Sequence, residues 1–212
     1  ARIYRLGAFR FSAGICIRGM LNGSSELIGE MSTGIAMFAY NLVIMRRIGV
    51  DGVTAFTIAG YTAYGFSMLV TGFGQGAGPL MSFAYGAGAY ELAGELRKRT
   101  NGYVFGAGIL VFLMMSVFSG WYGGLFVQNR EIEAMLRSGI MIFTSAFLWQ
   151  GFNAISSFYF TSTGRALESA VISLSRGLVV LLICIFTLPV WFGMTGVWMA
   201  APVTEAVTLG IT

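Results

Sequence analysis

One stretch of this chain, Val53 to Tyr85, contains no acidic or basic residue, and it constrains the fold more than any other feature. It is mostly apolar and includes the glycine-rich segment TGFGQGAGPL. Soluble domains carry about a quarter charged residues. This chain of 212 residues is 56% hydrophobic and only 10% charged. The sequence therefore predicts an integral membrane protein.

The apolar runs are longer than the ~20 residues that a helix needs to cross a bilayer, and they lack the alternation of a transmembrane strand. We therefore expect an all-α integral membrane protein with a bundle of six transmembrane helices. Residues 1–19 are basic and amphipathic, which suits a lead-in at the cytoplasmic membrane surface, and residues 20–212 form the six-helix lobe. The expected spans cover about residues 22–45, 52–88, 102–121, 135–160, 167–188 and 194–212.

The second of these spans is too long to cross a membrane as a straight upright helix. At 1.5 Å per residue it would measure about 55 Å, against a hydrocarbon core of roughly 30 Å. Pro79 removes one backbone hydrogen bond, so we expect a bend with Gly76, Gly78 and Pro79 as the hinge. The pairs Gly72 with Gly76 and Gly74 with Gly78 are spaced to let another helix approach closely.

The distribution of basic residues predicts the orientation. If the N-terminus is cytoplasmic, the inside loops carry more Lys and Arg than the outside loops, as the positive-inside rule requires. The inside set is Arg2, Arg5, Arg10, Arg18, Arg97, Lys98, Arg99 and Arg165, and the outside set is Arg46, Arg47, Arg130 and Arg137. We expect a multi-pass protein of the cell inner (plasma) membrane. Because the chain lacks a starting Met and stops within an apolar run, we also expect it to be an excerpt of a longer chain.

Several functional classes find no support in the sequence. The basic residues stand singly or in one short cluster between apolar spans, so we expect no nucleic-acid partner. The chain has no His, and Cys16 and Cys184 lack CxxC spacing, so we expect no metal site, no cofactor and no catalytic residues, and hence no enzyme. The glycine string lacks the lysine of a GxxxxGK[ST] loop, which argues against ATP-driven transport.

Two carboxylates in the first span are the leading candidates for chemistry. Glu26 and Glu30 are four residues apart and share one helix face. A carboxylate at the bilayer centre costs about 2.5 to 3.5 kcal/mol, so it needs a partner, a water-filled cavity or a proton. Neighbouring carboxylates raise each other's proton affinity, which suits a group that binds and releases H⁺ or Na⁺. The alternative for Glu26 is that it complements the helix N-terminus near headgroup water.

Other polar groups within the spans are further candidates. Glu205 and Arg176 are either buried functional charges or, for Arg176, a long side chain that reaches the interface. The amides in the spans either form interhelical hydrogen bonds or line a cavity, and with nearby aromatic rings they allow a wet interior that holds an amphipathic cation. The full set of candidates for substrate or ion binding is Glu26, Glu30, Asn41, Gln75, Gln150, Asn153, Arg176 and Glu205.

A series of motifs runs along the chain in a recognisable order. They are Asn22-Gly-Ser-Ser-Glu26, the stretch Gly72 to Ala87, Phe160-Thr-Ser-Thr-Gly-Arg165, Ser175-Arg176-Gly177, and Gly196-Val-Trp198 with Pro202 and Glu205. Together they resemble the C-terminal half of the multidrug and toxic compound extrusion (MATE) transporters. The resemblance implies one six-helix lobe of a two-lobe, twelve-helix transporter. Its partners would be drug-like small molecules, the lipid bilayer and the missing N-terminal lobe of the same chain.

The resemblance also implies a mechanism. Such transporters export cationic or amphipathic compounds in exchange for inward H⁺ or Na⁺, and those that bind the coupling cation in this lobe use carboxylates on its first and fourth helices. Glu26 or Glu30 fits the first position, whereas the fourth helix offers Asn153 and Gln150 but no carboxylate. Coupling through the missing lobe therefore stays open.

The leading hypothesis is a secondary active multidrug exporter. Two alternatives remain. A lipid-linked sugar flippase of related architecture would need a large basic cavity, for which Arg176 is the only indication. A non-transporting membrane scaffold would leave Glu26, Glu30 and Glu205 facing water or headgroups.

Overall fold

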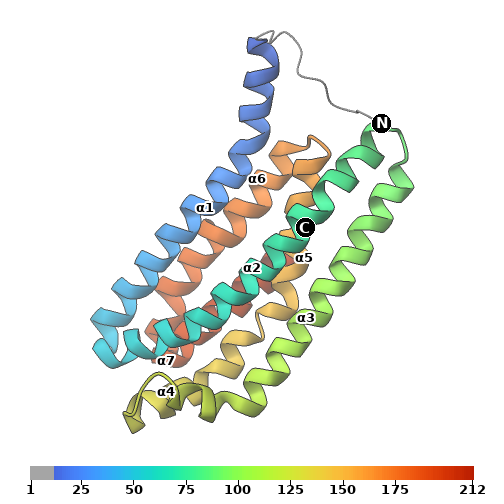
Figure 1. Ribbon diagram of the computed structural model, residues 1–212. Helices are drawn as coiled ribbons and strands as arrows, with labels where there is room; N and C mark the ends of the chain where they lie inside the picture. The colour runs from blue at the N-terminus through green and yellow to red at the C-terminus, as the bar shows by residue number, and fades with distance from the viewer. Residues whose placement is uncertain (1–11) are drawn as a thin grey trace.

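The computed structural model describes residues 12–212, with the side chains of Ser25 and Glu26 excepted. Over this part of the chain it contains helices and no strand (Figure 1). The helices are α1 (Ala13–Arg47), α2 (Val50–Gly86), α3 (Tyr90–Gly124), α4 (Arg130–Thr144), α5 (Phe147–Ser162), α6 (Ala166–Leu174), the π-helix η1 (Ser175–Val179) and α7 (Val180–Leu209).

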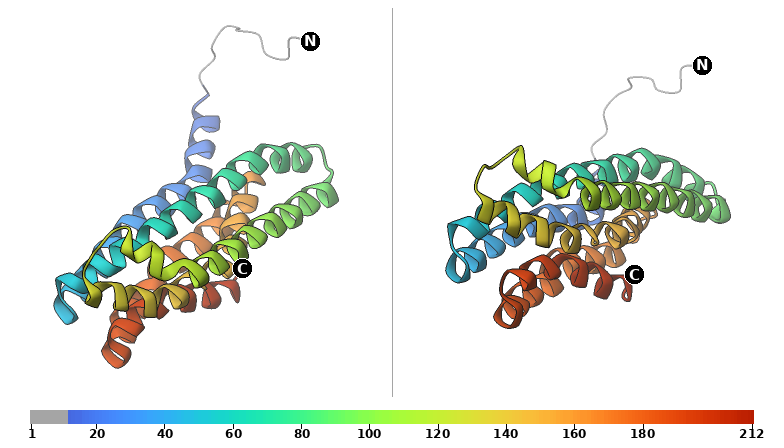
Figure 2. Two further views of the ribbon diagram at one scale, coloured as in Figure 1. Left: turned by 60° about the horizontal axis from the view of Figure 1, so that its bottom comes forward. Right: turned by 90° about the horizontal axis from the view of Figure 1, so that it is seen from below.

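Helix α1 begins before the expected start of the first span. Its first turns, up to Leu21, are exposed along their whole length and extend beyond the other helices (Figures 1 and 2). The expected amphipathic lead-in therefore divides in two. Its residues 1–11 lie outside the described part of the chain, and its remainder from Ala13 to Gly19 belongs to α1.

Helix α3 also begins earlier than expected, because the segment before residue 102 is helical rather than a loop. Gly88, with φ of 78°, turns the chain after α2, and α3 starts at Tyr90. Glu95 and Arg99 form an ion pair one turn apart, which supports the helix. Arg97 donates a hydrogen bond to Ser156 Oγ on α5 at 2.9 Å, so this end of α3 is tied to the bundle.

The fourth expected span is a broken helix. Its two parts, α4 and α5, are bent by 44° relative to each other. At the break, Thr144 Oγ1 donates to Ile140 O at 2.7 Å and Ser145 Oγ donates to Ile142 O at 2.6 Å. Hydroxyls that bond back to the preceding turn compete with the backbone amides and bend helices. The bend therefore has a local cause that hydrophobicity does not reveal.

The fifth and sixth expected spans form one continuous helical run that turns back at Gly193. This glycine has φ of 56° and ψ of −132°, a conformation that residues with a Cβ rarely adopt. Two residues after Met194, Gly196 lies against the backbone of Leu188 and Pro189, so the two arms of α7 meet closely at the turn (Figure 2).

Within residues 12–212, four helical runs are long and apolar enough to span a membrane, and a fifth is added if α4 and α5 count as one bent span. One of the four, Ala166–Leu209, has 44 residues and would measure about 66 Å if straight, roughly twice the hydrocarbon core. Because it turns at Gly193, it supplies two spans. The expected six-helix membrane lobe is confirmed.

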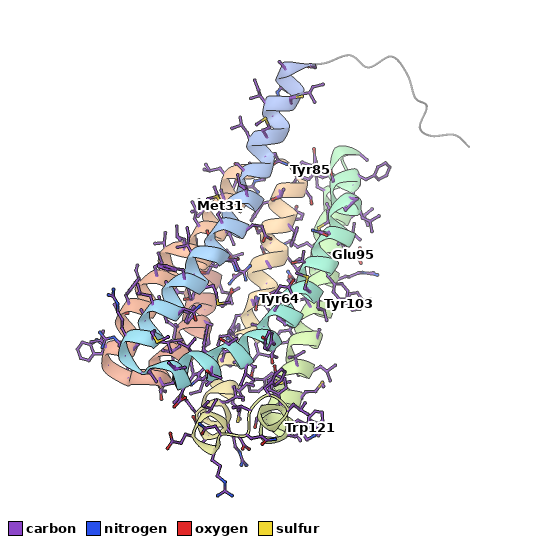
Figure 3. The ribbon with its side chains drawn as sticks, turned by 60° about the vertical axis from the view of Figure 1, so that its left-hand side comes forward. Met31, Tyr64, Tyr85, Glu95, Tyr103 and Trp121 are labelled. Atoms are coloured by element: carbon purple, nitrogen blue, oxygen red, sulfur yellow. The ribbon has the colours of Figure 1, made fainter. Side chains whose placement is uncertain are left out.

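The distribution of large side chains fits a bilayer. Tyr103 and Trp121 of α3 lie on the outside of the bundle and are exposed (Figure 3). The core instead surrounds Trp198, whose ring centroid lies 6.0 Å from that of Phe56 and 5.9 Å from that of Phe143. This cluster joins α2, α4 and the second arm of α7, so the protein packs aromatic side chains inside and presents others to lipid.

Candidate functional site

A groove on the surface of the lobe brings two of the expected site residues together. It is an open groove with a volume of about 810 Å³ and lies between α1, α2 and α5. Glu30 of α1 and Gln75 of α2 line it, with Phe158 and Thr161 of α5. The groove combines one carboxylate, amide and hydroxyl groups, and an aromatic ring.

Close packing of α2 against α5 shapes this groove. Gly74 lies against the ring of Phe158, where an added Cβ would overlap the ring, and Gly78 faces Ser162 Oγ. The expected close helix approach is thus confirmed for this pair of glycines. An added Cβ at Gly72 or Gly76 would have nothing within 4 Å among the described residues, so for them the close approach stays a prediction.

The residues of the predicted hinge all lie within α2. Helix α2 is continuous from Val50 to Gly86, and Pro79, at its groove-lining position, does not interrupt it. A bend that opens and closes around Gly76, Gly78 and Pro79 during function stays a prediction.

A second polar site lies inside the bundle, where three expected site residues meet. Arg176 donates from Nε and Nη2 to Glu205 Oε1, at 3.2 and 2.8 Å. Asn153 Nδ2 donates to Glu205 Oε2 at 2.7 Å and to the Glu205 carbonyl at 2.9 Å. Glu205 is 8% exposed and Asn153 is fully buried. We call these three residues the Glu205 cluster.

The π-helix places Arg176 in this cluster. A π-turn inserts an extra residue into a helix and changes the direction of the side chains around it, and such turns are frequent at functional sites. Next to Arg176, the missing side chain of Gly177 lets η1 approach α1, because an added Cβ would lie 2.8 Å from Ser32 Cβ. Arg176 therefore points to Glu205 rather than extending to the interface.

The Glu205 cluster supplies a carboxylate that the fourth span lacks. The sequence places Asn153 in that span without an acidic neighbour, and the structure brings Glu205 to it from the last span. Pairing with Arg176 makes the two charges neutral as a set, which lowers the cost of keeping them inside a membrane bundle.

A chain of hydroxyl groups joins α5 to α6, and sequence reasoning missed it. Thr161 and Ser157 of α5 lie 2.8 Å from Ser169 Oγ, and Ser157 Oγ lies 3.1 Å from Ser173 Oγ. Ser157, Ser169 and Ser173 are buried. The signal was present as two i, i+4 pairs, Ser157 with Thr161 and Ser169 with Ser173, which put hydroxyls on one face of each helix.

Three further buried hydroxyls have no hydrogen-bond partner among the described residues. They are those of Tyr40 on α1 and of Thr204 and Thr208 on α7. Thr204 and Thr208 lie one turn apart on α7.

The remaining expected site residues lie elsewhere. Asn41 Nδ2 donates to Met37 O at 3.0 Å, one turn earlier on its own helix, so its amide forms a local hydrogen bond. Gln150 Nε2 donates to Ser67 Oγ at 2.9 Å and links α5 to α2. The side chain of Glu26 lies outside the described side chains.

Comparison with known proteins places these sites in context. The sequence profile of the family described as MatE matches residues 27–186. None of the curated proteins matches the chain. Among solved structures, the chain is similar to a multidrug resistance MATE family transporter of the MOP superfamily in an outward-facing conformation. The TM-score is 0.90 and the sequence identity is 21%. The match covers 98% of this chain and 47% of that one.

Two further structures give the same result. A MATE protein in complex with MaL6 has a TM-score of 0.89 and 20% identity over 96% of this chain and 46% of that one. A MOP superfamily transporter from Pyrococcus furiosus, described as having a binding pocket of reversed polarity that suggests a different function, has a TM-score of 0.83 and 21% identity, with 96% and 46% covered. The chain thus spans about half the length of the transporters it matches.

Proposed function

Because the chain belongs to the MatE family, we propose that it is the C-terminal lobe of a secondary active multidrug exporter of the cell inner membrane. The full protein would export cationic or amphipathic compounds in exchange for H⁺ or Na⁺. The missing N-terminal lobe would complete the transport path, since binding sites in such folds lie between repeats.

The chemistry of the groove supports a cationic substrate. Glu30 is the only acidic or basic residue among the described residues that line it, so the groove carries a negative charge. Phe158 and Gln75 flank this carboxylate with an aromatic ring and an amide. A carboxylate attracts a cation, and an aromatic ring binds both its charge and its apolar groups. A lipophilic cation therefore matches the groove better than an anion does.

The two alternatives gain less support. A flippase for an anionic lipid-linked sugar needs basic groups in its cavity, but the described groove lining contains none, and Arg176 is already paired with Glu205. A scaffold would leave its carboxylates facing water or headgroups, whereas Glu205 is buried.

Substitution of the groove carboxylate tests the proposal. We expect Glu30→Gln in the full-length parent protein to lower efflux of tetraphenylphosphonium, a lipophilic cation, by about tenfold, because losing the charge removes ~1.4 kcal/mol of binding free energy. Efflux is measured in cells that make the wild type or the variant at matched levels.

Glu91→Gln is the matched control, because Glu91 is an exposed carboxylate in the first turn of α3 and away from the groove. It should leave efflux unchanged. Equal efflux by the wild type and Glu30→Gln would remove Glu30 from the substrate path.

A further inference from the structure

We propose that Arg97 and Arg165 form a binding site for the phosphate group of an anionic phospholipid, with the ring of Phe160 as their common support. The site lies where α3 meets the end of α5 and the start of α6, outside the groove and outside the Glu205 cluster. The inference does not depend on which compound the protein transports.

Arg97 carries a charge that no acidic group balances. Helical spacing aligns it with Ala93 and Val104, which are both buried, so it belongs to the packed face of α3 and is itself half-buried. Among the described side chains, no carboxylate lies within ion-pair distance of it. Glu95, on the exposed side of the helix, is paired with Arg99. Because a partly buried cation is stabilised by a nearby anion, its counter-charge is expected from a bound group.

Three contacts fix the orientation of the Arg97 guanidinium. Nη2 donates to Ser156 Oγ at 2.9 Å. The guanidinium carbon lies 5.2 Å from the ring centre of Tyr159 and 5.7 Å from that of Phe160. A guanidinium that lies over a ring keeps its N–H edges free, and the other N–H groups of Arg97 have no partner among the described residues. This edge is therefore oriented in advance for bidentate contact with an anion.

Arg165 brings a second guanidinium to the same ring. Its guanidinium carbon lies 4.8 Å from the ring centre of Phe160. The residue follows Gly164, whose φ of 77° turns the chain between α5 and α6. Two cations next to one ring repel each other, and an anion that contacts both removes this repulsion. A phosphate group, with several acceptor oxygens, suits a pair of arginines.

Glu168 makes the two arginines unequal. Its carboxylate forms an ion pair with Arg165 at 2.7 Å, so the charge of Arg165 is partly balanced. The side chains of this pair are 51% and 40% exposed, and ion pairs in such positions are weak. Arg97 is therefore the principal ligand of the phosphate, and Arg165 is an auxiliary ligand that Glu168 releases when the phosphate binds.

The depth of the site favours a phospholipid over a free anion. Arg97 precedes the expected start of the third span, residue 102, by about 7 Å along the helix at 1.5 Å per residue. The headgroup region adds roughly 5–8 Å to each side of the hydrocarbon core. Phe160 is the last residue of the fourth expected span. The two arginines therefore lie at the level of the headgroups, with the ring at the boundary of the acyl chains.

An apolar surface for an acyl chain continues from this site. Deeper along the junction of α3 and α5, the ring centres of Phe105 and Phe152 lie 5.3 Å apart. Both side chains are half-buried, so their outer surfaces are accessible. Phe105 lies two turns after Arg97, and Phe152 lies one turn before Ser156. A lipid with its phosphate on Arg97 can therefore lay an acyl chain along these rings.

The charge distribution selects an anionic headgroup. The start of α3 and the turn between α5 and α6 lie at the same end of the bundle (Figure 1). This end also carries Lys98 and Arg99, and the positive-inside rule predicts that it faces the cytoplasm. Basic sites between helices on the cytoplasmic side bind anionic headgroups. A zwitterionic headgroup brings its own ammonium group, which the arginines repel.

The test measures lipid binding to the full-length parent protein in detergent by native mass spectrometry. The probes are dioleoyl phosphatidylglycerol, which is anionic, and dioleoyl phosphatidylcholine, which is zwitterionic. We expect the wild type to bind one phosphatidylglycerol at least fivefold more tightly than phosphatidylcholine. Arg97→Gln should abolish this preference. Ser156→Ala, which keeps the charge but removes the hydrogen bond that orients it, should lower the preference in part.

Lys98→Gln is the matched control, because it removes one charge from the neighbouring, exposed position of the same helix. It should keep the preference for phosphatidylglycerol. Equal losses in Arg97→Gln and Lys98→Gln would show diffuse attraction to a basic surface and would overturn the inference. A wild type that binds the two lipids equally would also overturn it, and this result involves no variant and hence no folding defect.

Inorganic phosphate distinguishes the two sources of the same chemistry. In large excess it should leave the bound phosphatidylglycerol in place, because it lacks the acyl chains that contact the rings. Displacement of the lipid would assign the site to free phosphate and reject the lipid. None of these readouts involves transport, so a failure here leaves the proposed function untouched.

Discussion

Arg176 and Glu205 illustrate how single residues in a membrane bundle depend on one another. Each charge alone would be costly in an apolar interior. Together they are neutral, and the amide of Asn153 satisfies the second carboxylate oxygen. The side chains of Arg176 and Glu205 are only 22% and 11% exposed, so solvent screens the pair weakly. Each charge therefore depends on the other to be tolerated inside the bundle.

Removal of one partner should cost more stability than removal of both. We expect Arg176→Gln to lower the free energy of unfolding by about 3–5 kcal/mol, because it leaves a buried carboxylate unpaired. The double variant with Glu205→Gln should recover most of this loss. Unfolding of the full-length protein in detergent measures the double-mutant cycle, and additive losses would show that the two side chains do not interact.

For single residues, the sequence indicated which side chains are candidates for a site but not which of them are in contact. Glu205, Arg176 and Asn153 were each predicted as site residues, because polar groups are conspicuous in apolar spans. Their pairing depends on η1, whose extra residue per turn changes the direction of the Arg176 side chain. No simple residue pattern predicts a π-turn, so from the sequence Arg176 and Glu205 were two separate candidates.

The helices show which structural features follow from hydrophobicity and which follow from local hydrogen bonding. The all-α, six-helix lobe was predicted correctly, because the number and length of the apolar runs indicate it. The break between α4 and α5 was missed, because it comes from the hydroxyls of Thr144 and Ser145. The early start of α3 was missed because charged residues suggest a loop, although Glu95 and Arg99 pair along the helix.

The contact between α2 and α5 gives a prediction at the scale of helices. We expect Gly74→Ala to destabilise the lobe by about 1–3 kcal/mol, because the new methyl group overlaps the ring of Phe158. Gly72→Ala, two residues away on the open side of the same helix, should be neutral or slightly stabilising. Thermal unfolding of both variants in detergent provides the comparison, and equal melting temperatures would contradict the packing described here.

The whole molecule is a membrane lobe with a polar groove on one side and a buried ion pair near the groove. Its large exposed apolar and aromatic side chains suit contact with lipid or with a second lobe. The matched transporters are about twice as long as this chain. The sequence predicted Glu30 and Gln75 as site residues, but their place in one groove required the fold.

The central claim is that this groove is part of a substrate path, and chemical labelling tests it most directly. In the full-length protein, Cys16 and Cys184 are replaced by Ser, and a single cysteine is introduced by Gln75→Cys in the groove or by Leu110→Cys on the outer face of α3. We expect a membrane-impermeant thiol reagent to modify the Gln75→Cys variant and not the Leu110→Cys variant, and tetraphenylphosphonium to slow the reaction in the groove at least fivefold. Labelling of the groove cysteine at the same rate with and without the probe would contradict the account.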